Sequence, residues 1–219
     1  MLKRLFEAGG VIAGVILIAF GIGAILIGIT GRSEVRDNLK QEMIVGSPDM
    51  TPAETQKAVS EAGLKGVSVP SCDVAGETID TGSEAKCFAS YMRIHALEAT
   101  GGLTYAEMGR FVAKPDAPKS ATDGHGATSD EQYAQVDSAT GRPVENGLRN
   151  LWVTETALAT ALNTAFFAEQ VALFGIVVGI ALLLAGIGFV VLAYVGALRK
   201  REATAAAETR EGAEKPLHA

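Results

Sequence analysis

A chain of 219 residues with 48% hydrophobic residues and a mean hydropathy of +0.23 is too apolar for an ordinary soluble domain. The formal net charge is −6, and residues 32–170 alone carry 20 acidic and 12 basic side chains, a net of −8. Because phosphate binding needs a basic face, this balance argues against nucleic acid as a partner. The apolar residues are concentrated in two runs, residues 9–30 and 171–198, which contain no charged residue and no histidine.

Both apolar runs are long enough to cross a bilayer as helices, because about 20 residues at a rise of 1.5 Å each span a hydrocarbon core of about 30 Å. The first run follows the basic residues Lys3 and Arg4, as a signal peptide would. It is longer than the apolar part of a signal peptide, and no A-x-A-like cleavage site precedes residues 31–33, so we expect a retained membrane anchor. The lipid bilayer is the first expected partner.

The distribution of lysine and arginine predicts the orientation of the two spans. Basic residues flank the terminal sides of both spans: Lys3, Arg4, Arg199, Lys200, Arg201 and Arg210. Basic residues also follow the first span, but long loops translocate largely regardless of charge. We therefore expect a multi-pass plasma-membrane protein in which residues 1–8 and 199–219 are cytoplasmic and residues 31–170 form an extracellular loop module.

Within this loop the sequence predicts mostly helices. Val35, Leu39 and Met43 recur every four residues, which extends the first helix as a stalk over residues 31–45. Two stretches have the residue types of helix starts, Thr51 to Glu54 and Thr81 to Glu84, and predict helices over residues 52–63 and 82–100.

The last part of the loop contains a polar segment and a second stalk. Residues 114–143 are rich in Asp, Ser, Thr, Gly and Pro, which predicts a flexible loop. A helical stalk over residues 146–170 then leads into the second span. Its expected stripe consists of Leu151, Leu158, Leu162 and Ala165 and continues to Val171 in the second span. The predicted fold class is an all-α membrane protein, an antiparallel hairpin of two transmembrane helices with a mostly helical external module.

Small residues recur at heptad spacing in both spans, which lets helix backbones approach closely in a membrane. The candidate helix-packing residues are Gly14, Gly21, Gly28, Gly175, Gly179 and Gly186. The first interpretation is that one span packs on the other. Formation of a homo-oligomer through the same stripe is compatible with the pattern, and glycine is also common in transmembrane helices in general.

Cys72 and Cys87 are the only two cysteines, and both lie in the loop expected outside the cell. An oxidising compartment favours a disulfide between them, which would close a short loop and stabilise a module with a small core. Two free buried thiols and a metal pair are the alternatives. The metal pair is the weaker one, because no histidine lies nearby in the sequence.

The histidines are too few to indicate a metal centre. An iron site of the two-His-one-carboxylate type would need His95, His125 and an acid such as Glu98. We expect instead that His95 is a helix-surface or helix–helix contact residue and that His125 is solvated. His218 lies in the expected cytoplasmic tail, so no metal and no cofactor is predicted. The two spans also lack the ionisable residues that ion pathways need, which argues against transport by this chain alone.

Residues 94–107, with the sequence I-H-A-L-E-A-T-G-G-L-T-Y-A-E, resemble a stretch found in small actinobacterial two-pass membrane proteins of unknown function. The resemblance also covers the two-span layout and the acidic external loop, and it implies the same membrane location. Members of that family often carry the label "aromatic ring-opening dioxygenase". The residues of this chain do not support that label, because the histidine supply is marginal and no rigid substrate pocket can be inferred.

The same stretch predicts a corner between two helices. Gly101 and Gly102 suit the left-handed cap that ends a helix, and Thr104 with Glu107 would cap the next turn. This corner is a joint of the fold or a surface for a partner. Its candidate interaction residues are His95, Glu98, Gly101, Gly102, Tyr105 and Glu107.

Three functions follow as expectations. The first is a non-enzymatic binding or structural scaffold that presents an acidic external module to a membrane protein, a cell-envelope component or a ligand. The second is an accessory subunit of a larger membrane complex, with the glycine stripes in the contact between subunits. The third is a metal-dependent enzyme that uses His95.

Overall fold

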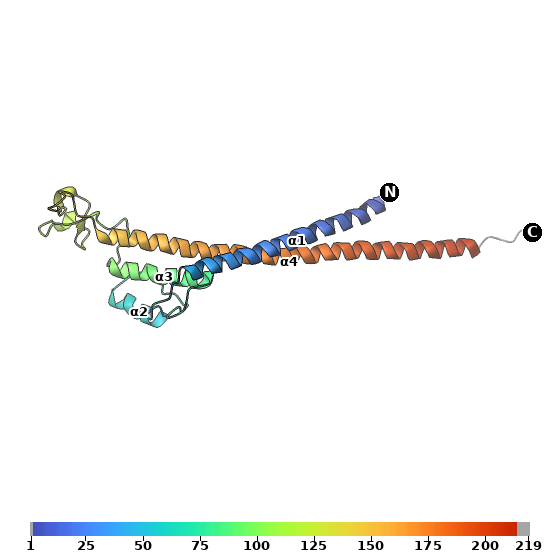
Figure 1. Cartoon of the computed structure of the whole chain (residues 1–219), viewed down its shortest axis with the longest axis horizontal. Coiled ribbons are helices and arrows are strands. Elements are labelled where there is room, and N and C mark those ends of the chain that lie inside the picture. Colours follow the sequence, from blue (N-terminus) through green and yellow to red (C-terminus); the bar gives the residue numbers. More distant parts are fainter. Residues whose placement is uncertain (1, 214–219) are drawn as a thin grey trace, which may run out of the picture. The chain divides into compact units, whose positions relative to one another are not determined.

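The computed structural model describes residues 2–213, with the side chains of residues 9–196, 199 and 202. Within these residues the chain forms four α-helices, which are α1 (Leu2–Gln41), α2 (Pro52–Glu61), α3 (Gly82–Ala99) and α4 (Gly147–Ala213) (Figure 1). His218 lies outside the described residues. The side chains of Lys3, Arg4, Lys200, Arg201 and Arg210, on which the orientation argument rests, also lie outside them.

The two longest helices, α1 and α4, contain segments long and apolar enough to cross a membrane, within Gly9–Gln41 and Gly147–Gly196. Only 17% and 11% of the residues in their most apolar stretches are buried. Most apolar side chains of these stretches therefore face outward, as they do in helices that contact lipid. This is consistent with insertion into a membrane.

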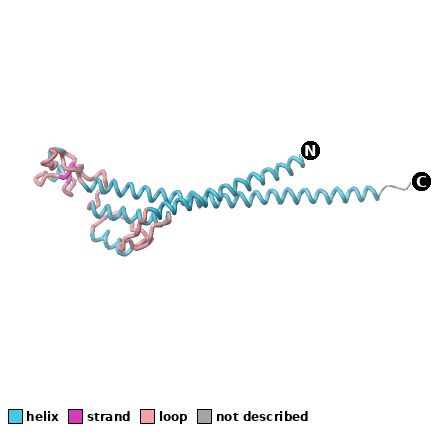
Figure 2. The backbone as a smooth tube through the Cα atoms, in the orientation of Figure 1, coloured by secondary structure: helices cyan, strands magenta, loops and turns pink. Residues whose placement is uncertain are grey.

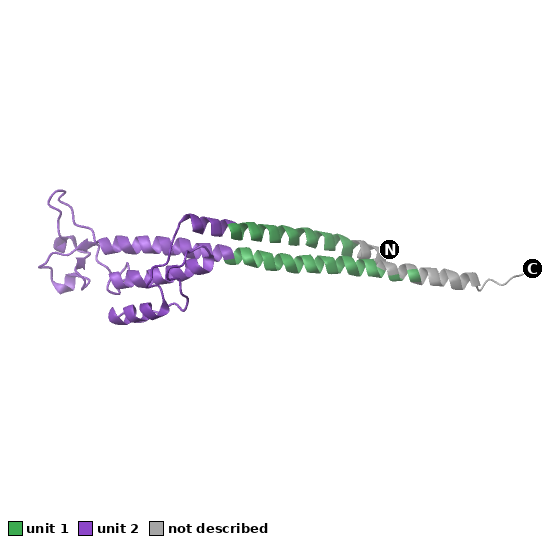
Figure 3. Ribbon diagram, turned by 60° about the horizontal axis from the view of Figure 1, so that its bottom comes forward, with its two compact units in different colours: residues 1–33, 170–219 green, residues 34–169 purple. Residues whose placement is uncertain are grey.

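The chain divides into two compact units (Figure 3). Unit 1 contains residues 1–33 and 170–219, and unit 2 contains residues 34–169. Unit 2 is called the module below.

In unit 1, close backbone contacts occur at glycines of both helices. A Cβ atom on Gly14 would lie 2.7 Å from the carbonyl oxygen of Gly186, and one on Gly21 would lie 2.7 Å from that of Gly179. Gly28 makes a third contact of the same kind. Gly14 meets Gly186, and Gly21, which lies further along α1, meets Gly179, which comes earlier in α4. The two helical segments of unit 1 therefore run antiparallel. Any larger side chain at these positions would push the backbones apart.

In the module, α3 lies at the centre of the core. The predicted disulfide between Cys72 and Cys87 is present and joins α3 to the preceding segment. Tyr91 is fully buried, and its hydroxyl donates a hydrogen bond to the carbonyl of Cys72. The core around it also includes Leu39, Met50, Val74, Ile79, Ala85, Phe88, Ala89, Ala159 and Leu162.

The predicted starts of α2 and α3 are confirmed. The hydroxyl of Thr51 accepts a hydrogen bond from the backbone nitrogen of Glu54, and Pro52 occupies the first helical position. Thr81 and Glu84 form a complete capping box, in which each side chain accepts from the backbone of the other residue. These short-range bonds satisfy N–H groups that a helix start would otherwise leave without a partner.

The end of the first stalk and the corner after α3 differ from the prediction. The first stalk ends at Gln41 and not at residue 45, and Met43 takes a left-handed backbone conformation with φ of 50°. After Gly101 and Gly102, which have the expected positive φ, residues 105–107 form the expected turn, but this turn does not begin a second helix. Glu107 accepts hydrogen bonds from Thr104, but these bonds stabilise only a single turn.

Residues 114–143 were predicted to form a flexible loop. In the structure they contain a short strand and two 3₁₀ helices, so the fold is not purely α-helical there. Strand β1 (Phe111–Val112) pairs antiparallel with β2 (Ala127–Thr128), shown as magenta segments in Figure 2. Two 3₁₀ helices complete this region, Lys119–Ala121 and Glu131–Tyr133. Hydrogen bonds from backbone N–H groups to acidic side chains such as Asp123 organise it without a large apolar core.

The buried stripe of α4 differs in part from the prediction. Leu162 is buried, and Leu158 and Ala165 are partly buried and pack against the core as expected, but Leu151 and Val171 are exposed, by 40% and 52%. The observed stripe is Trp152, Glu155, Ala159, Leu162 and Glu169. It includes two acids, because basic or N–H groups from other parts of the module meet them there.

Candidate functional site

A pocket of about 520 Å³ lies between α3 and the module part of α4. Its lining is largely apolar, with a few polar residues contributed by both helices, which is the usual composition of a small-molecule site. The lining residues are Met50, Phe88, Met92, His95, Ala96, Leu151, Thr154 and Glu155.

Glu155 is the most deeply buried charged residue of this lining, with 3% of its surface exposed. Its Oε2 atom lies 3.0 Å from Nη1 of Arg93, whose guanidinium stacks over the ring of Trp152 at 4.7 Å. The Thr156 hydroxyl donates a weaker hydrogen bond of 3.3 Å to the same oxygen. These contacts hold the carboxylate on the pocket wall.

The second carboxylate oxygen of Glu155 has no such partner. Its Oε1 atom is buried and accepts no hydrogen bond from the residues that the structure describes. A buried polar atom left without a hydrogen bond costs about 1–3 kcal/mol, and more when it belongs to a charged group. A donor placed in the pocket would remove this cost.

His95 presents a second atom of this kind. Its Nδ1 atom lies 3.0 Å from Oε2 of Glu98, and because a carboxylate only accepts, the hydrogen of this bond is on Nδ1. Nε2 is buried and lacks a hydrogen-bond partner in the described part of the chain, since Oδ2 of Asp49 is 3.6 Å away.

The surroundings of His95 are acidic. The Ser47 hydroxyl donates to the carboxylate of Asp49 and lowers its pKa, and proximity to His95 lowers it further. Asp49 is therefore ionised at neutral pH. With Glu98 on the other side, the histidine lies between two carboxyl groups.

The predicted corner is divided between the pocket and its surroundings. His95 lines the pocket and Glu98 orients it. Gly101 contacts the ring of His125, where an added Cβ would lie 2.6 Å from Nδ1. The Arg149 guanidinium covers the ring of Tyr105 at 3.9 Å. Glu107 bonds to Thr104, and these hydrogen bonds lower its pKa.

The other candidate residues lie elsewhere. Cys72 and Cys87 form the disulfide and do not line the pocket. Gly175 has only an ordinary contact, 3.7 Å from a Cβ on it to the carbonyl oxygen of Ala24. Among residues 2–213, no group of three or more His, Cys, Asp or Glu is placed to hold a metal, so the His95, His125 and Glu98 set does not form such a group.

Sequence reasoning missed Arg93, Glu155 and Glu169. The available signal was the position of the two acids, which fall on the same helical face as Leu162. An acid inside an apolar stripe of a helix is expected to have a buried partner or a function. Apolar periodicity alone does not identify such an acid.

Comparisons with protein-family models, with curated proteins and with solved structures found no match.

Proposed function

We propose that this chain is a two-pass plasma-membrane protein that holds its module on the extracytoplasmic side, with both termini in the cytoplasm. The module serves there as a non-enzymatic binding scaffold. The observation that carries this proposal is the disulfide between Cys72 and Cys87, which lies in the module and falls, along the sequence, between the two charge-free apolar runs at residues 9–30 and 171–198. Disulfides persist in oxidising compartments and are rare in the cytosol.

Binding by the module is favoured because the module contains a pocket lined by Glu155 and His95, each of which has a buried polar atom without a hydrogen-bond partner in the described part of the chain. The predominantly acidic surface of residues 32–170 adds long-range attraction for basic or cationic partners, such as a cell-envelope component or a ligand. The glycines that could form an intermolecular contact, Gly14, Gly21 and Gly186, make contacts within this chain. This supports a role of the spans in holding the two ends of the module together.

The topology is tested by single cysteines and a membrane-impermeant maleimide. Ser129 is exposed in the module and Glu202 is exposed beyond the second span. In intact cells the S129C variant should be labelled, and the E202C variant should be labelled only after permeabilisation. The wild-type chain is the control, because its two cysteines are paired. The reverse labelling pattern would overturn the proposed orientation.

The second candidate function, an accessory subunit of a membrane complex, is supported by a different observation. An added Cβ on Gly23 or Gly188 would meet nothing within 4 Å in the described part of the chain. These positions remain available to a neighbouring helix. If Gly23→Leu and Gly188→Leu shift the native size of the complex in mild detergent while ligand binding persists, the subunit function holds.

A further inference from the structure

We infer that the pocket between α3 and α4 binds a small amphiphilic cation, with an apolar body in the groove and an ammonium group that donates a hydrogen bond to the carboxylate of Glu155. This inference rests on the proposed role of the module as a binding unit. It names the chemical class of the ligand.

The first argument concerns buried polar atoms of the lining residues that lack a hydrogen-bond partner. The two buried atoms without a partner, Oε1 of Glu155 and Nε2 of His95, belong to residues that line the same pocket. Oε1 of Glu155 is an acceptor, because an ionised carboxylate only accepts hydrogen bonds. An ammonium group supplies N–H donors for this atom, which a carboxylate, a phosphate or an ether cannot do.

The second argument is charge. Glu155 is paired with Arg93, whereas His95 lies beside two carboxylates, those of Asp49 and Glu98, so that the acids of the site outnumber its basic groups. A cation offsets this excess of negative charge, whereas an anion would be repelled at short range. A neutral alcohol could donate a hydrogen bond but would leave the charge unbalanced.

The third argument is the shape and chemistry of the remaining lining. Met50, Phe88, Met92 and Leu151 supply an apolar surface, and a volume of about 520 Å³ is in the range of small-molecule sites. Methionine side chains adapt to irregular apolar shapes and contact aromatic rings favourably. The pocket therefore suits a primary or secondary amine with an alkyl or aryl body.

The chain provides its own reporter for such a ligand. Trp152 is the only tryptophan, it neighbours Leu151 of the lining, and Arg93 connects it to Glu155. Full-length protein in a nonionic detergent is titrated with 2-phenylethylamine, and binding is followed by Trp152 fluorescence and by calorimetry. Phenylacetate and 2-phenylethanol are the anionic and neutral analogues of the same body.

We expect the amine to bind about tenfold or more tightly than either analogue, because a hydrogen bond to a charged group is worth about 1.5–3 kcal/mol. The Glu155→Gln substitution should lower the affinity for the amine by a similar factor. Glu61→Gln, which removes the same charge from an exposed site, should change its affinity by less than about twofold. Equal binding of amine and analogues, or an unchanged affinity in Glu155→Gln, would overturn the inference.

A second variant keeps the test valid if Glu155→Gln unfolds the module. Leu151 is 40% exposed, so Leu151→Phe should be tolerated while its larger side chain narrows the groove. Loss of amine binding in this variant, with unchanged thermal unfolding, supports the inference. Unchanged binding contradicts it.

The outcomes separate this inference from the proposed function. Binding to purified protein does not depend on orientation in the membrane. If the labelling experiment places the module outside and the amine fails to bind, the ligand class is wrong and the scaffold proposal stands. If the amine binds and the labelling pattern is reversed, the topology is wrong and the ligand class stands.

Discussion

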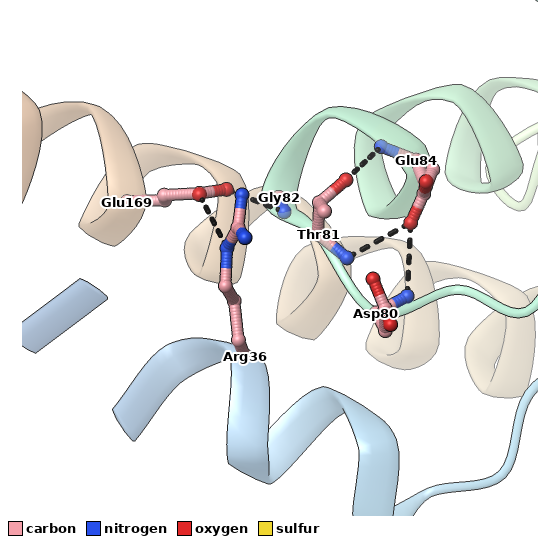
Figure 4. Close-up of polar contacts among 6 residues, drawn as sticks. All are labelled: Arg36, Asp80, Thr81, Gly82, Glu84 and Glu169. Atoms are coloured by element: carbon pink, nitrogen blue, oxygen red, sulfur yellow. Dashed lines mark hydrogen bonds and ion pairs between the residues drawn. The ribbon is translucent and has the colours of Figure 1, made fainter. Parts of the chain in front are cut away.

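The carboxylate of Glu169 accepts a hydrogen bond of 2.7 Å from the backbone nitrogen of Gly82, the first residue of α3 (Figure 4). Its other oxygen, Oε1, lies 3.0 Å from Nε of Arg36 near the end of α1. A carboxylate at a helix start satisfies a free N–H group and interacts favourably with the helix dipole. One buried acid of α4 thus connects three helices of the module.

Removal of this acid should destabilise the module. Loss of one partner of a buried, hydrogen-bonded ion pair typically costs about 3–5 kcal/mol, so we expect Glu169→Ala to lower the free energy of unfolding by about 3 kcal/mol. Urea denaturation in detergent, followed by Trp152 fluorescence, measures this change. The exposed Glu131 supplies the control Glu131→Ala, and equal effects of the two variants would contradict the structural role of Glu169.

Gly82 is required for the same contact. An added Cβ there would lie 2.7 Å from Oε2 of Glu169 and 2.8 Å from the Cα of Phe166. Gly82→Ala should therefore destabilise the module, although alanine is the better helix former. The matched control is Gly147→Ala at the start of α4, where an added Cβ meets nothing within 4 Å. The unfolding temperature of Gly82→Ala should be clearly lower than that of the control. The opposite order would contradict the close contact of Gly82 with Phe166 and Glu169.

The glycine contacts of unit 1 give a second matched pair. An added Cβ on Gly21 would lie 2.7 Å from the carbonyl oxygen of Gly179 and 2.8 Å from the backbone nitrogen of Leu183. Gly21→Leu should separate the two helical segments, whereas Gly23→Leu has open space. We expect the temperature of aggregation in detergent to fall for Gly21→Leu only. If both variants behave alike, the helices are not packed through this stripe.

Reduction of the disulfide should destabilise the module by about 3 kcal/mol, the chain-entropy value for a closed loop of about 15 residues. The Cys72→Ser, Cys87→Ser double variant should show this loss in urea denaturation. A reducing agent should produce the same loss in the wild-type chain and none in the variant. A wild-type stability that does not respond to reduction would mean that the two thiols are unpaired.

Asp123 should make part of the stability depend on pH. Burial alone would raise the pKa of this carboxyl, but hydrogen bonds from the backbone N–H groups of Gly109, His125 and Ala127 hold it below 3.8. Because the folded-state pKa is lowered, the stabilisation is complete above the unfolded pKa of about 3.9 and is lost as the pH falls through the folded value. Asp123→Asn should be less stable than wild type at pH 7, and the difference should shrink below about pH 4. A difference that is constant from pH 7 to pH 2.5 would rule out this linkage.

Local features of the chain were predictable from the sequence because their physical causes are local. The helix starts at Thr51 and Thr81 depend on hydrogen bonds to residues three positions away, and the apolar spans depend only on composition and length. The disulfide between Cys72 and Cys87 followed from the presence of two cysteines in a loop expected outside the cell.

Which face of α4 is buried could be seen only in the tertiary structure. Hydrophobicity placed Leu151 inside, but the partners of Glu169 lie 133 and 87 residues away in the sequence, and Arg93, the ion-pair partner of Glu155, lies on another helix. The pocket is formed by residues of α3 and α4 that meet only in the folded chain. Apolar periodicity indicates which side chains avoid water. It does not show which acids find a buried partner, and Glu155 and Glu169 lie on the buried face of α4 with such partners.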